Sequence, residues 1–286
     1  MPKRLDTRDP SFKDEFTAFV SQKRETTADV NSAVETILLD VRRRGNDAVC
    51  ESTARFDRFQ ITPDTMVFSP KEISAARAKC PTDTLHALDL AAERIRGFHK
   101  KQFPDDLDET DAAGLRLGYR WTAVSAVGLY VPGGTAAYPS SVLMNAIPAK
   151  IAGVERLVMV VPTPEGIVNP LVLAAAEVAK VDTILRIGGA QAIGVLAYGT
   201  ETIEPVDKIV GPGNAFVAAA KRQVYGTVGI DMIAGPSEIL VYVEPPMDPD
   251  WVAMDLFSQA EHDEDAQPIL VYCDPSFAAT VLDSMN

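Results

Sequence analysis

The stretch that decides the fold runs from Val206 to Val224 and reads VDKIV-GPGN-AFVAAAKRQV. Its first part, Val206–Val210, is short and mostly apolar, which predicts a buried strand, and its last part, Ala215–Val224, predicts a helix. Between them, Gly211–Asn214 forms a turn in which glycine lets a ligand approach the backbone closely. Because the following helix presents free N–H groups, such a junction suits a phosphate-bearing ligand.

The same junction occurs twice more upstream, at Gly133-Gly134 and at Gly188-Gly189. Short apolar strands that alternate with helices predict an α/β fold with a parallel sheet covered on both faces. Right-handed crossovers then place all three glycine turns at the carboxyl edge of the sheet, where open α/β sheets bind ligands. The chain contains neither G-x-G-x-x-G nor a P-loop, so the turns fit either a nucleotide site or ordinary tight connections.

Around this segment, the periodicity predicts further elements of both kinds. The predicted helices cover residues 11–23, 30–41, 47–54, 82–100, 141–151, 169–180, 190–198, 251–262 and 276–285, and one more begins at Pro70. The other predicted strands are 65–68, 115–121, 127–131, 156–161, 183–187, 239–243 and 268–273, and residues 105–111 are predicted to be an acidic loop.

Composition narrows the function classes. A net charge of −13 on 286 residues argues against nucleic-acid binding through a basic patch. The three cysteines are far apart and form no C-x-x-C, which indicates a reducing compartment and no thiolate zinc site. The first residues lack a signal peptide's apolar core, and no apolar run approaches the roughly 18 residues of a membrane span. A cytoplasmic protein with no membrane partner is therefore expected.

Four side chains are candidates for a site on their residue type and spacing. Asn214 can offer its amide to a ribose or phosphate, or it can cap the helix that begins at Ala215. Tyr130 can contact a cofactor or belong to the core. Gln259 and His262 lie three apart on a predicted helix and project to one face, as a pair of zinc ligands would. Two ligands do not complete a zinc site, so a solvated helix end remains the alternative.

Several strings of residues, taken together, resemble the histidinol dehydrogenase family in order and spacing. They are GLYVPGG (128–134), GGAQAI (188–193), VGPGN (210–214), AGPSE (234–238) and SQAEH (258–262). The resemblance implies a zinc-dependent, four-electron oxidation of L-histidinol to L-histidine through L-histidinaldehyde, with two NAD per turnover. It also implies a zinc ion that positions the substrate.

By position, the resemblance assigns roles to six residues. The implied NAD contacts are Tyr130, Gln191 and Asn214, the implied substrate contact is Ser237, and Gln259 and His262 are the implied zinc ligands, which also face the substrate.

The resemblance further implies two Rossmann-like lobes of the aldehyde-dehydrogenase-like kind, one inserted in the other. Residues 127–237 would form the inserted NAD-binding lobe, residues 26–126 with 238–286 the other, incomplete lobe, and residues 1–25 a helical N-terminal arm.

Family members are longer. The Glu-His acid–base pair, two more zinc ligands and a tail that joins a homodimer are expected beyond Asn286. The chain alone is therefore expected to be inactive or nearly so. An NAD-binding fragment without turnover, and a related dehydrogenase for another small amino- or hydroxy-alcohol, are the alternatives.

Overall fold

The computed structural model describes residues 3–133, 138–233, 238–244, 246–261 and 266–285, with only the helical backbone for residues 21–28. The chain divides into two compact units, Met1–Ile233 and Ala234–Asn286. The helices are α1 (Phe12–Arg44), α2 (Asn46–Phe56), α3 (Pro70–Arg77), α4 (Thr82–His99), α5 (Pro139–Ala152), α6 (Pro170–Val178), α7 (Gly189–Tyr198), α8 (Ala215–Val224), α9 (Pro249–Ala260) and α10 (Pro275–Ser284). The strands are β1 (Leu107–Thr110), β2 (Arg116–Tyr119), β3 (Ala126–Tyr130), β4 (Arg156–Val160), β5 (Thr183–Leu185), β6 (Lys208–Val210), β7 (Gly229–Ile230), β8 (Glu238–Val243) and β9 (Gln267–Tyr272).

The first unit is built on a five-stranded parallel sheet with strand order β5-β4-β3-β6-β7. The predicted strands at residues 127–131, 156–161, 183–187 and 206–210 all join this sheet, which confirms the α/β fold class. Strand order runs outward from β3 in both directions, so β3 and β6 meet at a topological switch point.

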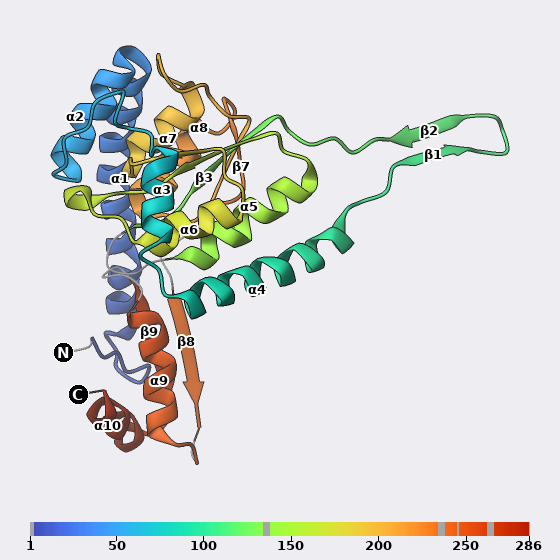
Figure 1. Cartoon of the computed structure of the whole chain (residues 1–286). Coiled ribbons are helices and arrows are strands. Elements are labelled where there is room, and N and C mark those ends of the chain that lie inside the picture. Colours follow the sequence, from blue (N-terminus) through green and yellow to red (C-terminus); the bar gives the residue numbers. More distant parts are fainter. Residues whose placement is uncertain (1–2, 134–137, 234–237, 245, 262–265, 286) are drawn as a thin grey trace. The chain divides into compact units, whose positions relative to one another are not determined.

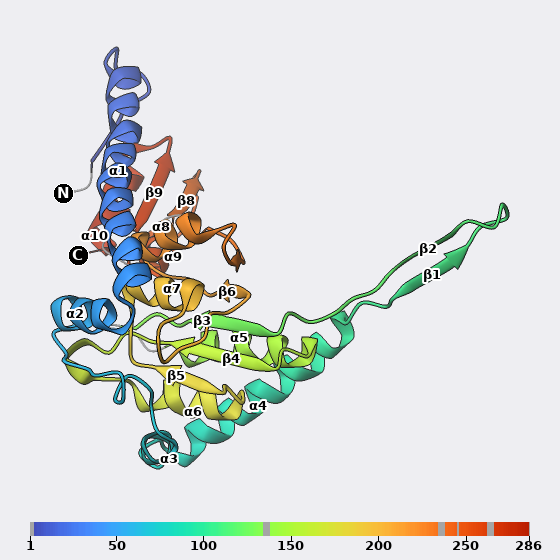
Figure 2. The same cartoon turned by 90° about the horizontal axis from the view of Figure 1, so that it is seen from above.

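Helices cover both faces of the sheet (Figure 2). Helices α3, α4, α5 and α6 pack on one face, and α1, α2, α7 and α8 pack on the other. The alternation of side chains along β3 shows this directly, because Val127 and Leu129 belong to the first core and Ala126 and Tyr130 to the second. All five residues of β3 are buried, as expected for a central parallel strand.

The N-terminal helix differs from the prediction. The periodicity indicated two helices, at residues 11–23 and 30–41, whereas α1 is continuous over 33 residues. No glycine or proline occurs between the two predicted segments, so nothing in the backbone ends the first helix. The helix ends at Arg44, and Gly45 follows as its C-cap with φ +53°.

Three short extended segments also differ from the prediction. Part of the predicted acidic loop forms β1, which pairs antiparallel with β2, and an Asp108–Arg116 ion pair also joins the two strands. This hairpin projects away from the sheet in both views (Figure 1). Residues 65–68 make only a bridge, Val67 to Leu185, on the edge of β5. Strand β7 has only two residues, Gly229 and Ile230, too few to show a pattern in the sequence.

The second unit contains a β-α-β motif. Strands β8 and β9 pair in parallel, α9 connects them, and α10 follows. Val243, Val252, Leu256 and Val281 form its small buried core. Among the described residues of the whole chain, no helix combines the length and apolar character of a membrane span.

The turn after β6 brings two strand ends into close contact. Gly211 has φ +115°, and a Cβ atom built there would lie 2.1 Å from the backbone oxygen of Tyr130 at the end of β3. Only glycine therefore fits, both for its backbone conformation and for the space available.

Gly211→Ala is expected to destabilise the protein by at least about 3 kcal/mol, because backbone strain and a clash add together. Gly226→Ala is the matched control, since Gly226 has φ +101° but no heavy atom within 4 Å of a built Cβ; strain alone should cost about 1–2 kcal/mol. Urea unfolding of both variants measures the difference. Equal losses would show that the contact with Tyr130 does not constrain the turn.

Candidate cofactor site

The predicted cofactor contacts lie at one edge of the parallel sheet. Tyr130 is the last residue of β3, Gln191 lies in the first turn of α7 after β5, and Asn214 precedes α8 after β6. In a parallel sheet with right-handed crossovers, these positions share the carboxyl edge. The structure therefore brings Gln191 and Asn214 to the same edge of the sheet as Tyr130, although they lie 61 and 84 positions further along the chain.

Tyr130 is buried, and its hydroxyl accepts a hydrogen bond of 3.1 Å from the backbone N–H of Gly189 at the start of α7. Burial raises the pKa of Tyr130 to about 12; the Gly189 N–H lowers it, and the charge of Asp57 adds to the rise. The phenol is therefore neutral at physiological pH and keeps a hydrogen to donate. Both interpretations of Tyr130 are compatible with this position, because the ring lies in the core and the hydroxyl lies at the sheet edge.

Gln191 is 1% exposed, an unusual degree of burial for a glutamine. Its side-chain oxygen lies near Gly189, where φ is +63° and a built Cβ would be 2.8 Å from that oxygen. Within the described part of the chain, no hydrogen bond uses the Gln191 amide. A buried amide at a sheet edge without such a bond has hydrogen-bonding capacity for a ligand.

Asn214 caps α8, as one of the two sequence interpretations predicts. Its Oδ1 accepts a hydrogen bond of 3.1 Å from the Val217 N–H. The cap uses the oxygen, and the side chain is exposed, so the Nδ2 group remains available to a ligand. Capping and ligand binding are therefore compatible in this residue.

Asp57 is a polar residue near this edge that the sequence prediction missed. Its Oδ2 is buried without a hydrogen-bond partner among the described residues. Burial raises the pKa of Asp57, and a hydrogen bond from the Thr163 N–H lowers it less. The Glu165 N–H, in the loop after β4, donates to the Asp57 carbonyl at 2.7 Å. A carboxyl group that directly follows a helix looks like a solvated helix end in the sequence, so no local signal could have found it.

A second missed feature is the buried ion pair between Lys221 on α8 and Asp231 after β7. The sequence contained a signal here, because Lys221 has the helical spacing of Val217 and Val224, both of which are buried. A lysine on an apolar helix face requires a buried partner.

The candidate zinc ligands are only partly described. Gln259 lies on α9 in the second unit, whereas Ser237 and His262 lie outside the described residues. Nε2 of Gln259 is buried without a partner, and exchange of the amide O and N by a flip would leave an oxygen there instead. That orphaned amide is compatible with a ligand role. One neutral oxygen does not make a zinc site, and no cluster of three His, Cys, Asp or Glu side chains occurs in the described part.

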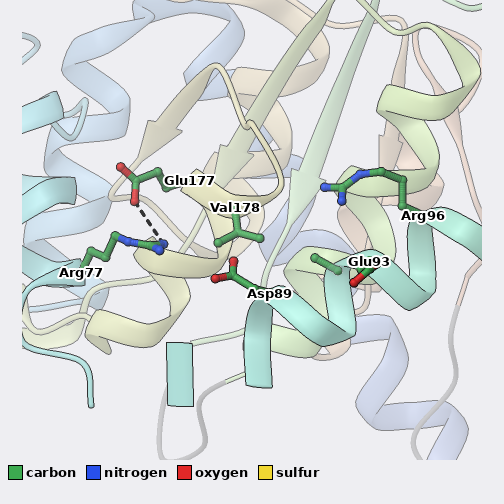
Figure 3. Close-up of a pocket in the computed structure, with 7 residues that line it drawn as sticks. Arg77, Asp89, Glu93, Arg96, Glu177 and Val178 are labelled. Atoms are coloured by element: carbon green, nitrogen blue, oxygen red, sulfur yellow. Dashed lines mark ion pairs between the residues drawn. The ribbon is translucent and has the colours of Figure 1, made fainter. Parts of the chain in front are cut away.

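One surface pocket lies away from these residues. It has a volume of about 590 Å³, is lined by α3, α4 and α6, and includes the 3.4 Å ion pair between Arg77 and Glu177 (Figure 3). These helices cover the sheet face opposite α7 and α8, and none of the predicted site residues lines the pocket. The chemistry of the strand ends, rather than pocket size, therefore identifies the candidate site.

Tyr130→Phe is expected to lower the free energy of unfolding by about 1 kcal/mol, because it leaves the partly buried Gly189 N–H without its acceptor. Tyr198→Phe is the control: the Tyr198 ring lies 5.6 Å from the Arg42 guanidinium, and its hydroxyl makes no hydrogen bond within the described chain. Its change should stay within about 0.5 kcal/mol. Urea denaturation measures both, and equal effects would contradict a structural role for the Tyr130 hydroxyl.

The chain is similar to known proteins in sequence. A sequence profile described as "Histidinol dehydrogenase" matches residues 20–286. Proteins named histidinol dehydrogenase from Cereibacter sphaeroides and Ruegeria pomeroyi are each 60% identical over 286 residues, which is all of this chain and 66% of each relative. The chain thus spans slightly less than two thirds of the length of these curated relatives.

A solved structure is also similar. The crystal structure of histidinol dehydrogenase from Elizabethkingia anophelis superposes with a TM-score of 0.77 at 37% identity, over 89% of this chain and 59% of that one. The profile covers nearly the whole chain, and the relatives share more than half of its residues. The chain belongs to the histidinol dehydrogenase family.

Proposed function

We propose that the protein containing these residues oxidises L-histidinol to L-histidine through L-histidinaldehyde, with NAD as electron acceptor, in histidine biosynthesis. Family membership supports the reaction. The observation that carries the cofactor assignment is the shared location of Tyr130, Gln191 and Asn214 at the carboxyl edge of a sheet with strand order β5-β4-β3-β6-β7. That order corresponds to 3-2-1-4-5, the arrangement of dinucleotide-binding folds.

In this proposal, each of the three residues binds NAD through a free polar group. Asn214 donates its Nδ2 hydrogens while its Oδ1 caps α8. Tyr130 donates its phenolic hydrogen and is itself oriented by the Gly189 N–H. Gln191 supplies an amide from the first turn of α7. The N-terminus of α7 adds a positive dipole end, which favours the negative pyrophosphate.

The substrate end of the proposed site involves Ser237, Gln259 and His262. Bound zinc would hold the amine and imidazole of histidinol in place, with Gln259 and His262 among its ligands. Support comes from their spacing along the chain and from the buried Gln259 amide that lacks a partner. Loss of a hydride from an alcohol also requires a base for the proton. We propose that a Glu-His pair in the further length of the relatives acts as acid and base.

The proposal extends to organisation. Residues 127–237 would be the inserted NAD-binding lobe, residues 26–126 with 238–286 the second lobe, and residues 1–25 an arm. The protein would act as a homodimer in the cytoplasm, a location that the three free thiols, Cys50, Cys80 and Cys273, support.

A full-length protein containing this chain should reduce NAD in the presence of histidinol, and removal of metal by a chelator should abolish the activity until zinc is restored. The 286-residue chain should bind NAD without turnover. Absorbance at the NADH band measures the reaction, and other small amino- or hydroxy-alcohols test the alternative substrate. A full-length protein inactive with histidinol but active with another alcohol would refute the substrate assignment.

Asn214→Ala should raise the dissociation constant of NAD about tenfold, the loss of one good hydrogen bond, and should lower stability by about 1 kcal/mol through the lost cap. Asn169→Ala is the matched control, because Asn169 caps α6 in the same way, with Oδ1 accepting from the Leu171 N–H at 2.9 Å. It should lose similar stability and keep its NAD affinity. Calorimetric titration separates the two, and equal affinities would remove Asn214 from the site.

A further inference from the structure

The buried pair Lys221–Asp231 forms a polar cluster behind the turn at residues 211–214. The Lys221 side chain is 4% exposed, the least exposed of any basic group in the ion pairs of the described chain, and that of Asp231 is 29% exposed. Burial raises the pKa of Asp231, but the Lys221 ammonium and the N–H groups of Gly211 and Met232 together outweigh it, so the pKa lies below its usual value. Asp231 is therefore ionised at neutral pH.

Both partners of the pair hold the same residue. Nζ of Lys221 donates to the Gly211 carbonyl at 2.9 Å, and the Gly211 N–H donates to Oδ2 of Asp231 at 2.8 Å. The second oxygen of Asp231 accepts from Lys221 and from the Met232 N–H. Every polar backbone group of Gly211 thus has a charged partner, and charge-assisted hydrogen bonds are the stronger kind.

The position of Gly211 determines where the rest of the turn lies. Gly211 lies against the backbone of Tyr130, because a Cβ atom built at Gly211 would be only 2.1 Å from the Tyr130 backbone oxygen. Three residues later, Asn214 caps α8, the helix that carries Lys221. The pair therefore links α8 and the end of β7 to the turn that presents Asn214.

Stability alone is a poor explanation for this pair. Burial of the Lys221 ammonium and partial burial of the Asp231 carboxylate carry a desolvation penalty, and apolar residues of similar volume are often equally or more stabilising. The neighbours of Lys221 on the buried face of α8 are Val217 and Val224, among which a methionine would pack well. What an apolar residue cannot supply is a pair of charges directed at one glycine.

We propose that Lys221 and Asp231 are positioning residues that hold the turn at residues 211–214 in the conformation that binds the dinucleotide. The inference rests on the proposed NAD site. In the strand order of this sheet, β3, β4 and β5 form the half that takes the adenine nucleotide, and the β6 turn belongs to the other half. Loss of the pair should therefore weaken NAD more than ADP.

The experiment uses the 286-residue chain with Lys221→Met, Asp231→Asn and the double variant Lys221→Met/Asp231→Leu. Calorimetric titration gives the dissociation constants of NAD and ADP, and urea unfolding gives the stability. The single variants should lose stability, because each leaves a buried partner unpaired. The double variant should regain stability close to wild type. All three should bind NAD at least tenfold more weakly and bind ADP within twofold of wild type.

Lys150→Met is the matched control. Lys150 at the end of α5 pairs with Asp182 at 2.7 Å, and Asp182 in turn accepts from the Leu157 N–H at 2.7 Å. This second Lys–Asp pair holds backbone at the amino edge of the same sheet, so Lys150→Met should keep both affinities.

Wild-type NAD affinity in a folded double variant would refute the inference alone, because the turn would then keep its conformation without the pair. A parallel loss of NAD and ADP would also refute it, since the effect would not be confined to the turn. Failure of the wild-type chain to bind NAD would refute the proposed cofactor site and this inference with it. If a single variant does not fold, the double variant decides the outcome.

Discussion

Helices cover both faces of the five-stranded sheet, and this double burial constrains the rest of the first unit. Every residue of β3 is buried, so that strand has no solvent-facing side on which polar groups could gather. Polar side chains are left with the strand ends, where backbone groups are also free. Tyr130, Gln191 and Asn214 all lie at such ends, on the edge where the helices begin.

The turn after β6 lies close to the end of β3, and this contact restricts the backbone of the candidate site. Gly211 fits against Tyr130 only because it has no side chain. Apolar packing sets the spacing of the strands, but it cannot orient a polar turn. The hydrogen bonds from Lys221 and to Asp231 do so, at the expense of burying two charges. Packing and directed polar contacts therefore have separate roles in the same structure.

Much of the fold could be predicted, because helix and strand periodicities are local properties of the chain. Four sheet strands and the glycine turns at Gly188-Gly189 and Gly211 lie where the alternation of apolar segments indicated. The errors were also local in origin. Helix α1 continues through a segment with no apolar pattern because nothing ends it, and β7 is too short to show a period. Strand β1 forms only by pairing with β2 in a hairpin. Its acidic composition alone predicted a loop.

The α/β class, the family and the order of most elements could be derived from the sequence, because they follow from local patterns and from strings of adjacent residues. The tertiary structure alone decided which polar groups meet. Asp57 reaches the loop after β4, and Lys221 and Asp231 meet at Gly211. These contacts depend on strand order and crossover direction rather than on spacing along the chain. Direct hydrogen bonds act over about 3 Å, and only the folded sheet brings residues from separate elements within that distance.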